Sequence, residues 1–195
     1  MLLSMLSMFG YISAALSIAM VVPYIVDMLK HKTKPERASW FIWLALGSIA
    51  FFSQMAKGAT ESLWLTAGQT VAVSVVFLLS IKYGVGGFGR RDIKALIGAT
   101  IGLILWFFTR EALFALLLVI LVDAMGNFLT MLKSYESPGT ETLSTWFMSG
   151  TSGIFGMLAV GSINPILLAY PAYLVLANYG IVISIILGRI NKRRG

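Results

Sequence analysis

The chain contains no cysteine and only one histidine in 195 residues. Without cysteine it can form no disulfide bond and no thiolate metal site, and it has no cysteine nucleophile. Charged residues are also scarce: they make up 12% of the chain, against about 25% in soluble domains, whereas 58% of the residues are hydrophobic. A chain of this length cannot bury so much apolar surface in its own interior. The composition therefore excludes an ordinary soluble domain, a disordered chain and a coiled coil.

Sequence motifs of common enzymes are missing as well. The chain has no HExxH, GxSxG or P-loop pattern, so it lacks the residues for metal-assisted hydrolysis, serine-type acyl transfer or nucleotide-driven chemistry. The single histidine, His31, stands in a loop among lysines. We therefore expect no enzymatic activity, no cofactor and no metal site.

Long apolar stretches make up most of the sequence. A helix needs about 20 mostly apolar residues to cross a bilayer, and seven stretches approach or exceed that length. Their apolar residues do not alternate with polar ones, which excludes the strands of a transmembrane barrel. The sequence thus predicts an all-α membrane protein with seven transmembrane helices, over residues 8–29, 38–57, 61–82, 93–109, 111–132, 142–160 and 165–188.

The basic residues indicate how these helices are oriented. The net charge is +7, and nearly all Lys and Arg residues fall on one side of the predicted membrane, leaving only Lys57 and Arg110 on the other. Because cytoplasmic loops carry such an excess, we expect the N-terminus outside and the C-terminus in the cytoplasm. The positive charge is then an orientation signal and does not indicate a nucleic-acid partner. The basic residues of the predicted inner side are Lys30, Lys32, Lys34, Arg37, Lys82, Arg90, Arg91, Lys94, Lys133, Arg189, Lys192, Arg193 and Arg194.

Two segments of the chain share a pattern that indicates an internal repeat. Each has Leu-Lys at the end of a predicted helix, then a loop with proline, then a hydroxyl residue followed by Trp-Phe: Leu29-Lys30, Pro35 and Ser39-Trp40-Phe41 in the first, Leu132-Lys133, Pro138 and Thr145-Trp146-Phe147 in the second. Three helices per repeat is an odd number, so one extra crossing is needed to make the copies parallel. The sequence predicts a 3+1+3 plan: residues 1–83 form the first triple-helix bundle, 84–109 the loop and linker helix, and 110–195 the second bundle with its basic tail.

This plan resembles the PQ-loop/SWEET superfamily, which contains sugar transporters, the half-sized SemiSWEETs, cystinosin-like amino-acid exporters and the KDEL receptors. Pro23-Tyr24 stands where the family has Pro-Gln, and Gly126-Asn127 stands at the matching place in the second repeat. A proline inside a helix commonly kinks it, so we expect a kink at Pro23 that would serve as a hinge of an inner gate, with Gly126 in the same role in the second repeat. The resemblance also gives weight to Asn178, because SWEET-like carriers place a substrate-binding asparagine in the last helix. The hinge prolines that SWEETs have in helices 2 and 6 are absent here.

A few polar side chains interrupt the apolar stretches. Asp123 is the only acidic residue predicted near the middle of a span, and Asn127 lies one turn away on the same helix face. An ionisable group inside the membrane is costly and commonly marks a ligand or ion pathway, although a structural hydrogen-bonding role for Asp123 is the alternative. Asn178 is equally compatible with binding and with helix packing. We predict that these three residues line a substrate site, with weaker candidates Tyr24, Gln54, Trp64 and Gln69.

The tryptophans at the predicted inner boundary allow a simpler interpretation. Trp40, Trp43 and Trp146 begin the second and sixth predicted helices. Aromatic belts at membrane interfaces are common, so we expect these three indoles to form such a belt.

The sequence therefore favours a secondary transporter or facilitator that moves a small polar solute by alternating access, with proton coupling through Asp123 left open. A membrane receptor or scaffold that does not transport is the alternative. The expected partners are the lipid bilayer and a small-molecule substrate, and a homo-oligomer is compatible with the sequence. The short loops favour a prokaryotic inner membrane.

Overall fold

The computed structural model describes residues 2–56, 61–87, 89–109, 112–161, 163 and 165–194. The regular structure of these residues is helical, apart from one isolated β-bridge between Glu36 and Val85, so the all-α class is confirmed. Every predicted apolar stretch coincides with helix, and the first is divided into two. The elements are α1 (Leu2–Ala19), α2 (Val21–Leu29), α3 (Arg37–Ala56), α4 (Glu61–Tyr83), α5 (Arg90–Thr109), α6 (Ala112–Glu136), the short 3-10 helix η1 (Pro138–Thr140), α7 (Leu143–Val160) and α8 (Pro165–Arg194).

Three stretches of helix in the described residues are long and apolar enough to cross a membrane. They are Met5–Leu29, Leu143–Val160 and Leu168–Arg193, and a shorter apolar helix covers Gln69–Tyr83. Large apolar side chains such as Val22, Val71 and Leu176 point outward and are mostly exposed. Soluble proteins rarely expose so much apolar surface, so these features suggest an integral membrane protein.

The break between α1 and α2 follows from Pro23. Proline has no backbone N–H, so the carbonyl of the residue four positions earlier loses its helical partner. α1 ends at that residue, Ala19, and α2 begins at Val21. The carbonyl of the intervening Met20 accepts a hydrogen bond from the hydroxyl of Thr145 on α7 at 2.9 Å. Pro23 therefore interrupts its helix one turn before its own position, between Ala19 and Val21.

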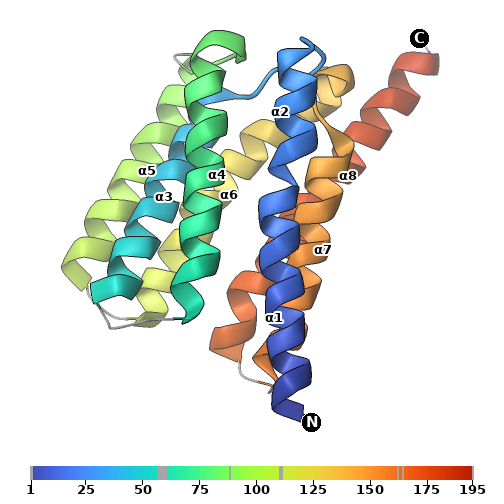
Figure 1. Cartoon of the computed structure of the whole chain (residues 1–195). Helices are drawn as coiled ribbons and strands as arrows, with labels where there is room; N and C mark the ends of the chain where they lie inside the picture. The colour runs from blue at the N-terminus through green and yellow to red at the C-terminus, as the bar shows by residue number, and fades with distance from the viewer. Residues whose placement is uncertain are drawn as a thin grey trace.

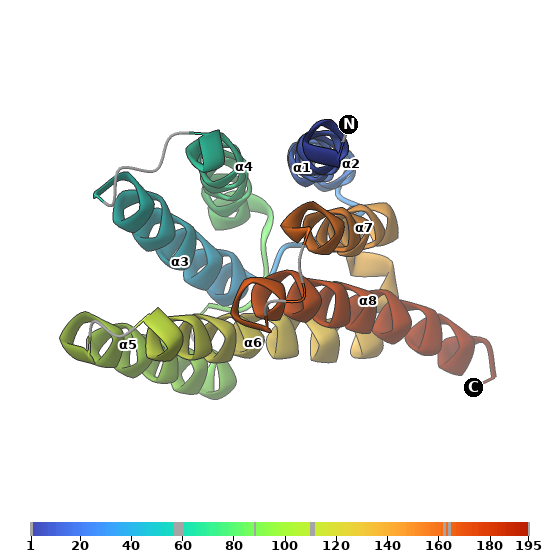
Figure 2. The same ribbon diagram turned by 90° about the horizontal axis from the view of Figure 1, so that it is seen from below.

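The helices pack in two triplets with the same internal order. In the first, α4 packs between α3 and the α1–α2 rod; in the second, α8 packs between α7 and α6 (Figures 1 and 2). Between the triplets, α1 packs against α7 and α3 packs against α6, while α5 lies against α6 and α3. The two triplets correspond helix by helix: α1 to α6, α3 to α7 and α4 to α8. The contacts of α4 with α1 and α3 in the first triplet are matched by the contacts of α8 with α6 and α7 in the second. An internal duplication produces such a pattern.

The segments rich in Lys and Arg gather at one end of the bundle. Figure 1 shows the connection from α2 to α3, the end of α4 and the C-terminus at this end, with the N-terminus at the opposite one. We call it the basic end, comprising residues 30–37, 82–87, 89–90, 133–142 and 189–193. Its loops are joined by hydrogen bonds, since the Arg37 guanidinium donates to the carbonyls of Ser80, Gly84 and Gly86 at 2.7–2.9 Å, and the Lys34 N–H donates to the carbonyl of Thr140 at 2.9 Å.

Gly84 provides a test of this packing. A Cβ at Gly84 would lie 2.7 Å from the Pro35 carbonyl oxygen and would also press on the Ser80 carbonyl. Both are backbone atoms, which cannot move away as a flexible side chain can. We therefore expect Gly84→Ala to lower the free energy of unfolding by about 1–3 kcal/mol. Thermal unfolding in detergent measures the change. Gly139→Ala, in another loop of the basic end but with no neighbour within 4 Å, is the control, and equal effects of the two substitutions would contradict the prediction.

Candidate functional site

The predicted pair Asp123 and Asn127 lies on the face of α6 that turns into the bundle. Their relative exposures are 6% and 5%. The Asn127 side-chain amide donates to the Asp123 carboxylate at 3.0 Å and to the Asp123 backbone carbonyl at 3.1 Å. The spacing of one helical turn therefore brings the two side chains together as predicted.

Tyr173 on α8 is a third member of this cluster, and it was not among the residues predicted from the sequence. The Asn127 amide also contacts the Tyr173 hydroxyl at 3.0 Å, and that hydroxyl hydrogen-bonds to the Asp123 carboxylate as well. The ring of Tyr170 lies 6.2 Å from that of Tyr173, centroid to centroid. The available signal was a pair of tyrosines one turn apart in the apolar first half of α8. We call Asp123, Asn127, Tyr170 and Tyr173 the carboxylate cluster.

The other predicted binding residues do not join the carboxylate cluster in the described part of the chain. Asn178 is buried, but its side-chain amide donates to the Leu174 carbonyl of its own helix at 2.7 Å. Gln69 is partly buried on α4, and no hydrogen bond joins it to the cluster. The side chains of Gln54 and Trp64 lie outside the described residues.

Tyr24 belongs to a second cluster, at the basic end. Its ring lies 5.0 Å from Trp40 on α3 and 6.1 Å from Trp146 on α7, and Trp43 lies 5.6 Å from Trp146. The expectation of an interfacial belt is wrong for Trp40 and Trp146, which are only 2% and 4% exposed. Both indole N–H groups find acceptors inside the protein: Trp40 donates to the Tyr24 hydroxyl at 3.3 Å and Trp146 to Glu141 at 2.9 Å.

A buried ion pair completes this second cluster. Glu141 accepts hydrogen bonds from Trp146 and, at 3.3 Å, from the Tyr24 hydroxyl. Lys133 at the end of α6 forms an ion pair with Glu141 and donates to the Lys34 carbonyl. Glu141 was not predicted from the sequence, although it stands between the loop proline and Trp146, much as Glu36 stands before Trp40. We call Tyr24, Trp40, Trp43, Trp146, Lys133 and Glu141 the aromatic gate.

Beside the aromatic gate, a hydrogen bond between two threonines joins the loop after α2 to the start of α7. The hydroxyl oxygens of Thr33 and Thr142 are 2.5 Å apart, and Thr142 donates to the Asp27 carboxylate at 3.0 Å. These bonds and the contacts of the aromatic gate join α2 and the loop after it to the start of α7 at the basic end.

The hydrogen bonds between the triplets also give the register of the repeats. The Ser39 hydroxyl donates to the Gly126 carbonyl at 2.7 Å, and the Thr145 hydroxyl donates to the Met20 carbonyl at 2.9 Å. Thr145 follows Ser39 by as many residues as Gly126 follows Met20, so the two hydrogen bonds are equivalent in the two repeats. The structural equivalent of Gly126 is therefore Met20 rather than Pro23. Gly126 also packs closely, since a Cβ there would lie 3.0 Å from the Trp43 indole nitrogen.

In this register the carboxylate cluster has no acidic counterpart in the first triplet. The position equivalent to Asp123 is Ser17, whose hydroxyl donates to the Ser152 hydroxyl at 3.1 Å. The buried residues of the two helices correspond in pairs: Ser17 with Asp123, Val21 with Asn127, Tyr24 with Thr130, and Met28 with Ser134. The site is thus asymmetric, with a single carboxylate on the second triplet.

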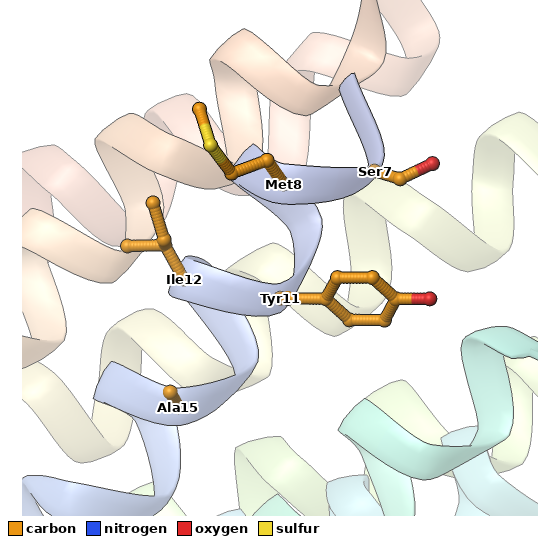
Figure 3. A pocket seen from close by; sticks show the side chains of 5 residues that line it. All are labelled: Ser7, Met8, Tyr11, Ile12 and Ala15. Carbon is orange, nitrogen blue, oxygen red and sulfur yellow. The ribbon is translucent and has the colours of Figure 1, made fainter. Parts of the chain in front are cut away.

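The hollows near described residues include one beside α1 and one at the basic end. A volume of about 570 Å³ lies along the middle of α1 and is lined in the described residues by Ser7, Met8, Tyr11, Ile12 and Ala15. Figure 3 shows Ser7 and Tyr11 pointing to one side of the helix and Met8 and Ile12 to the other. A smaller volume of about 180 Å³ at the basic end is lined by Glu36, Val85, Gly86, Leu129, Leu132, Lys133 and Glu136. Asp123 lines neither of these two hollows, and in the carboxylate cluster Asp123 and Asn127 are buried whereas Tyr170 and Tyr173 are partly exposed.

No protein-family model, curated protein or solved structure matches this chain. The resemblance to the PQ-loop/SWEET superfamily stays a prediction that rests on the residues quoted above.

Proposed function

We propose that this chain is a secondary transporter or facilitator of a small polar solute that works by alternating access. One observation carries the proposal: Asp123 is buried between α6 and α8, and its hydrogen-bonding partners among the described residues are neutral. A buried carboxylate costs stability, and inside a membrane bundle such a group usually marks a pathway. A protein that needed only packing at this position would be more stable with an apolar side chain.

The membrane arrangement is the next part of the proposal. α1 with α2, and each of the helices α3 to α8 (η1 apart), cross the bilayer once, giving seven spans in a 3+1+3 plan. The basic end faces the cytoplasm, because positive loops are retained there, and the N-terminus lies outside. The excess of Lys and Arg at one end of the bundle supports this orientation, and a prokaryotic inner membrane is the proposed location.

Alternating access requires the two triplets to move against each other. The contacts that must then change are those of α1 with α7 and of α3 with α6, which are the contacts between the triplets. In the present conformation the aromatic gate and the threonine pair join the triplets at the basic end, while the larger hollow lies beside the middle of α1. Opening of the gate would expose the site to the cytoplasm, with the helix break before Pro23 and the close packing at Gly126 as the points of movement.

A membrane receptor or scaffold is the second candidate. The observation that favours it is the saturation of Asp123 by Asn127 and Tyr173, because a satisfied network can serve to fix the position of α6 against α8. Such a protein would bind a partner or ligand without moving a solute across the bilayer.

Uptake into proteoliposomes tests the proposal. The purified chain is reconstituted and presented with labelled sugars, amino acids, nucleosides and small amines. For a transported solute, Asp123→Asn should lower the initial rate about tenfold, because a hydrogen bond to a charged group contributes about 1.5–3 kcal/mol. Glu136→Gln removes an exposed carboxylate at the basic end and should leave the rate unchanged. Undiminished uptake by Asp123→Asn would contradict the role of the carboxylate, and no uptake of any solute would favour the receptor or scaffold.

A further inference from the structure

We propose that the solute is a small organic ammonium ion with one positive charge, bound by the Asp123 carboxylate against the rings of Tyr170 and Tyr173. This inference rests on the proposed transport function and specifies its substrate class. Three observations lead to it: the charge balance around Asp123, the aromatic pair beside it and the asymmetry of the two triplets.

The first observation is that Asp123 has no cationic partner among the described residues. Lys133 at the basic end forms its ion pair with Glu141 and not with Asp123. Asp123 interacts instead with the amide of Asn127 and the hydroxyl of Tyr173, which are neutral. Buried charges in proteins are normally paired. A cationic solute supplies the missing charge, whereas a neutral sugar would need only hydrogen-bonding groups at this position.

The second observation is the pair of tyrosine rings beside the carboxylate. Tyr170 and Tyr173 lie one turn apart on α8, with ring centroids 6.2 Å apart and planes inclined by 34°. The Tyr173 hydroxyl hydrogen-bonds to the Asp123 carboxylate, and the ring contact places Tyr170 beside Tyr173. The face of an aromatic ring attracts a cation through its quadrupole, and aromatic rings are the usual surroundings of bound ammonium groups. A carboxylate and two rings together favour an alkylammonium ion over a solvated metal cation.

The third observation limits the charge of the solute. In the register given by the hydrogen bonds between the triplets, the counterpart of Asp123 is Ser17, which is bonded to Ser152. One carboxylate on the second triplet and the neutral Ser17 hydroxyl at the equivalent position of the first match a solute with a single positive charge.

The test compares two solutes of equal shape. Choline and 3,3-dimethylbutan-1-ol differ in one atom, nitrogen against carbon, and therefore in charge alone. Equilibrium binding of labelled choline to the purified full chain is competed with unlabelled choline, ethanolamine and the neutral alcohol. We expect the ammonium compounds to bind at least tenfold more tightly than the neutral alcohol, and Asp123→Asn to remove most of this preference. Equal binding of choline and the alcohol, or a preference that survives Asp123→Asn, would overturn the inference.

Matched variants of Tyr173 separate the ring from the hydroxyl. Tyr173→Phe keeps the ring and should leave choline affinity within about threefold, whereas Tyr173→Leu removes the ring and should weaken it about tenfold. The reverse order would contradict the aromatic part of the site.

Uptake of the same solutes into proteoliposomes distinguishes this inference from the function on which it rests. Ammonium-selective binding and uptake together support both. Uptake of neutral solutes but not of ammonium compounds would overturn the substrate class and leave the transporter. Ammonium-selective binding without uptake of any solute would support the site and overturn transport.

Discussion

Replacing Lys133 with methionine is expected to lower the free energy of unfolding by about 3–5 kcal/mol, which is the range measured when one partner of a buried ion pair is removed. The side chains of Lys133 and Glu141 are 13% and 0% exposed, so water cannot compensate the carboxylate once the ammonium group is gone. Methionine preserves the length and apolar stem of lysine, and the loss therefore reports the charge. A shift of this size is a large share of the stability of an ordinary domain.

Thermal unfolding of the detergent-solubilised chain measures the loss. Lys32→Met, which removes an exposed lysine from the same end of the bundle, should change the midpoint little. The double variant Lys133→Met/Glu141→Gln should recover much of the stability, because it leaves no unpaired charge while the introduced amide oxygen can still accept the Trp146 hydrogen bond. A double variant as unstable as Lys133→Met alone would contradict the charge-pair explanation.

The local features of the bundle could be predicted from the sequence because their causes are local. Apolar stretches between Pro and Gly-rich loops indicated the helix ranges, and the spacing of Asp123 and Asn127 placed them on one face of one helix. Tyr173 could not be found in this way, because its contact with Asn127 joins α6 to α8. Such a contact depends on how two helices pack, and apolar helices of this kind offer several faces for packing.

The tryptophans illustrate a second limit. An indole near a helix end is compatible both with the membrane interface and with a buried aromatic cluster. What decides for Trp146 is the buried Glu141, and Glu141 is stable there because of Lys133 on α6. The position of Trp146 on α7 therefore depends on Glu141 in the preceding loop and on Lys133 on α6. The sequence around Trp146 does not determine it.

The register of the repeats shows a third limit. Aligning Leu29-Lys30 with Leu132-Lys133 pairs Pro23 with Gly126, one turn away from the register found in the structure. A shift of one helical turn keeps nearly the same face toward the core, so hydrophobicity cannot distinguish the two alignments. The hydrogen bonds of Ser39 and Thr145 to carbonyls of the opposite triplet do distinguish them.

The second large effect is expected from locking the basic end. Because the chain has no native cysteine, Thr33→Cys/Thr142→Cys introduces a single possible disulfide between the loop after α2 and the start of α7. The two hydroxyl oxygens are 2.5 Å apart, which places the side chains within reach of disulfide geometry. If the aromatic gate must open in each cycle, oxidation should abolish uptake into proteoliposomes almost completely, and reduction should restore it.

A disulfide within one triplet is the matched control for this experiment. An ideal Cβ at Gly47 on α3 would lie 3.7 Å from the Thr70 Cβ on α4, close to the Cβ separation of natural disulfides, about 3.8 Å. Oxidised Gly47→Cys/Thr70→Cys should therefore transport normally, because triplets that move as units keep α3 and α4 together. Uptake that persists with the basic end locked would contradict opening at that end. Loss of uptake in oxidised Gly47→Cys/Thr70→Cys would instead mean that α3 and α4 move against each other during transport. The two disulfides therefore distinguish movement between the triplets from movement within one triplet.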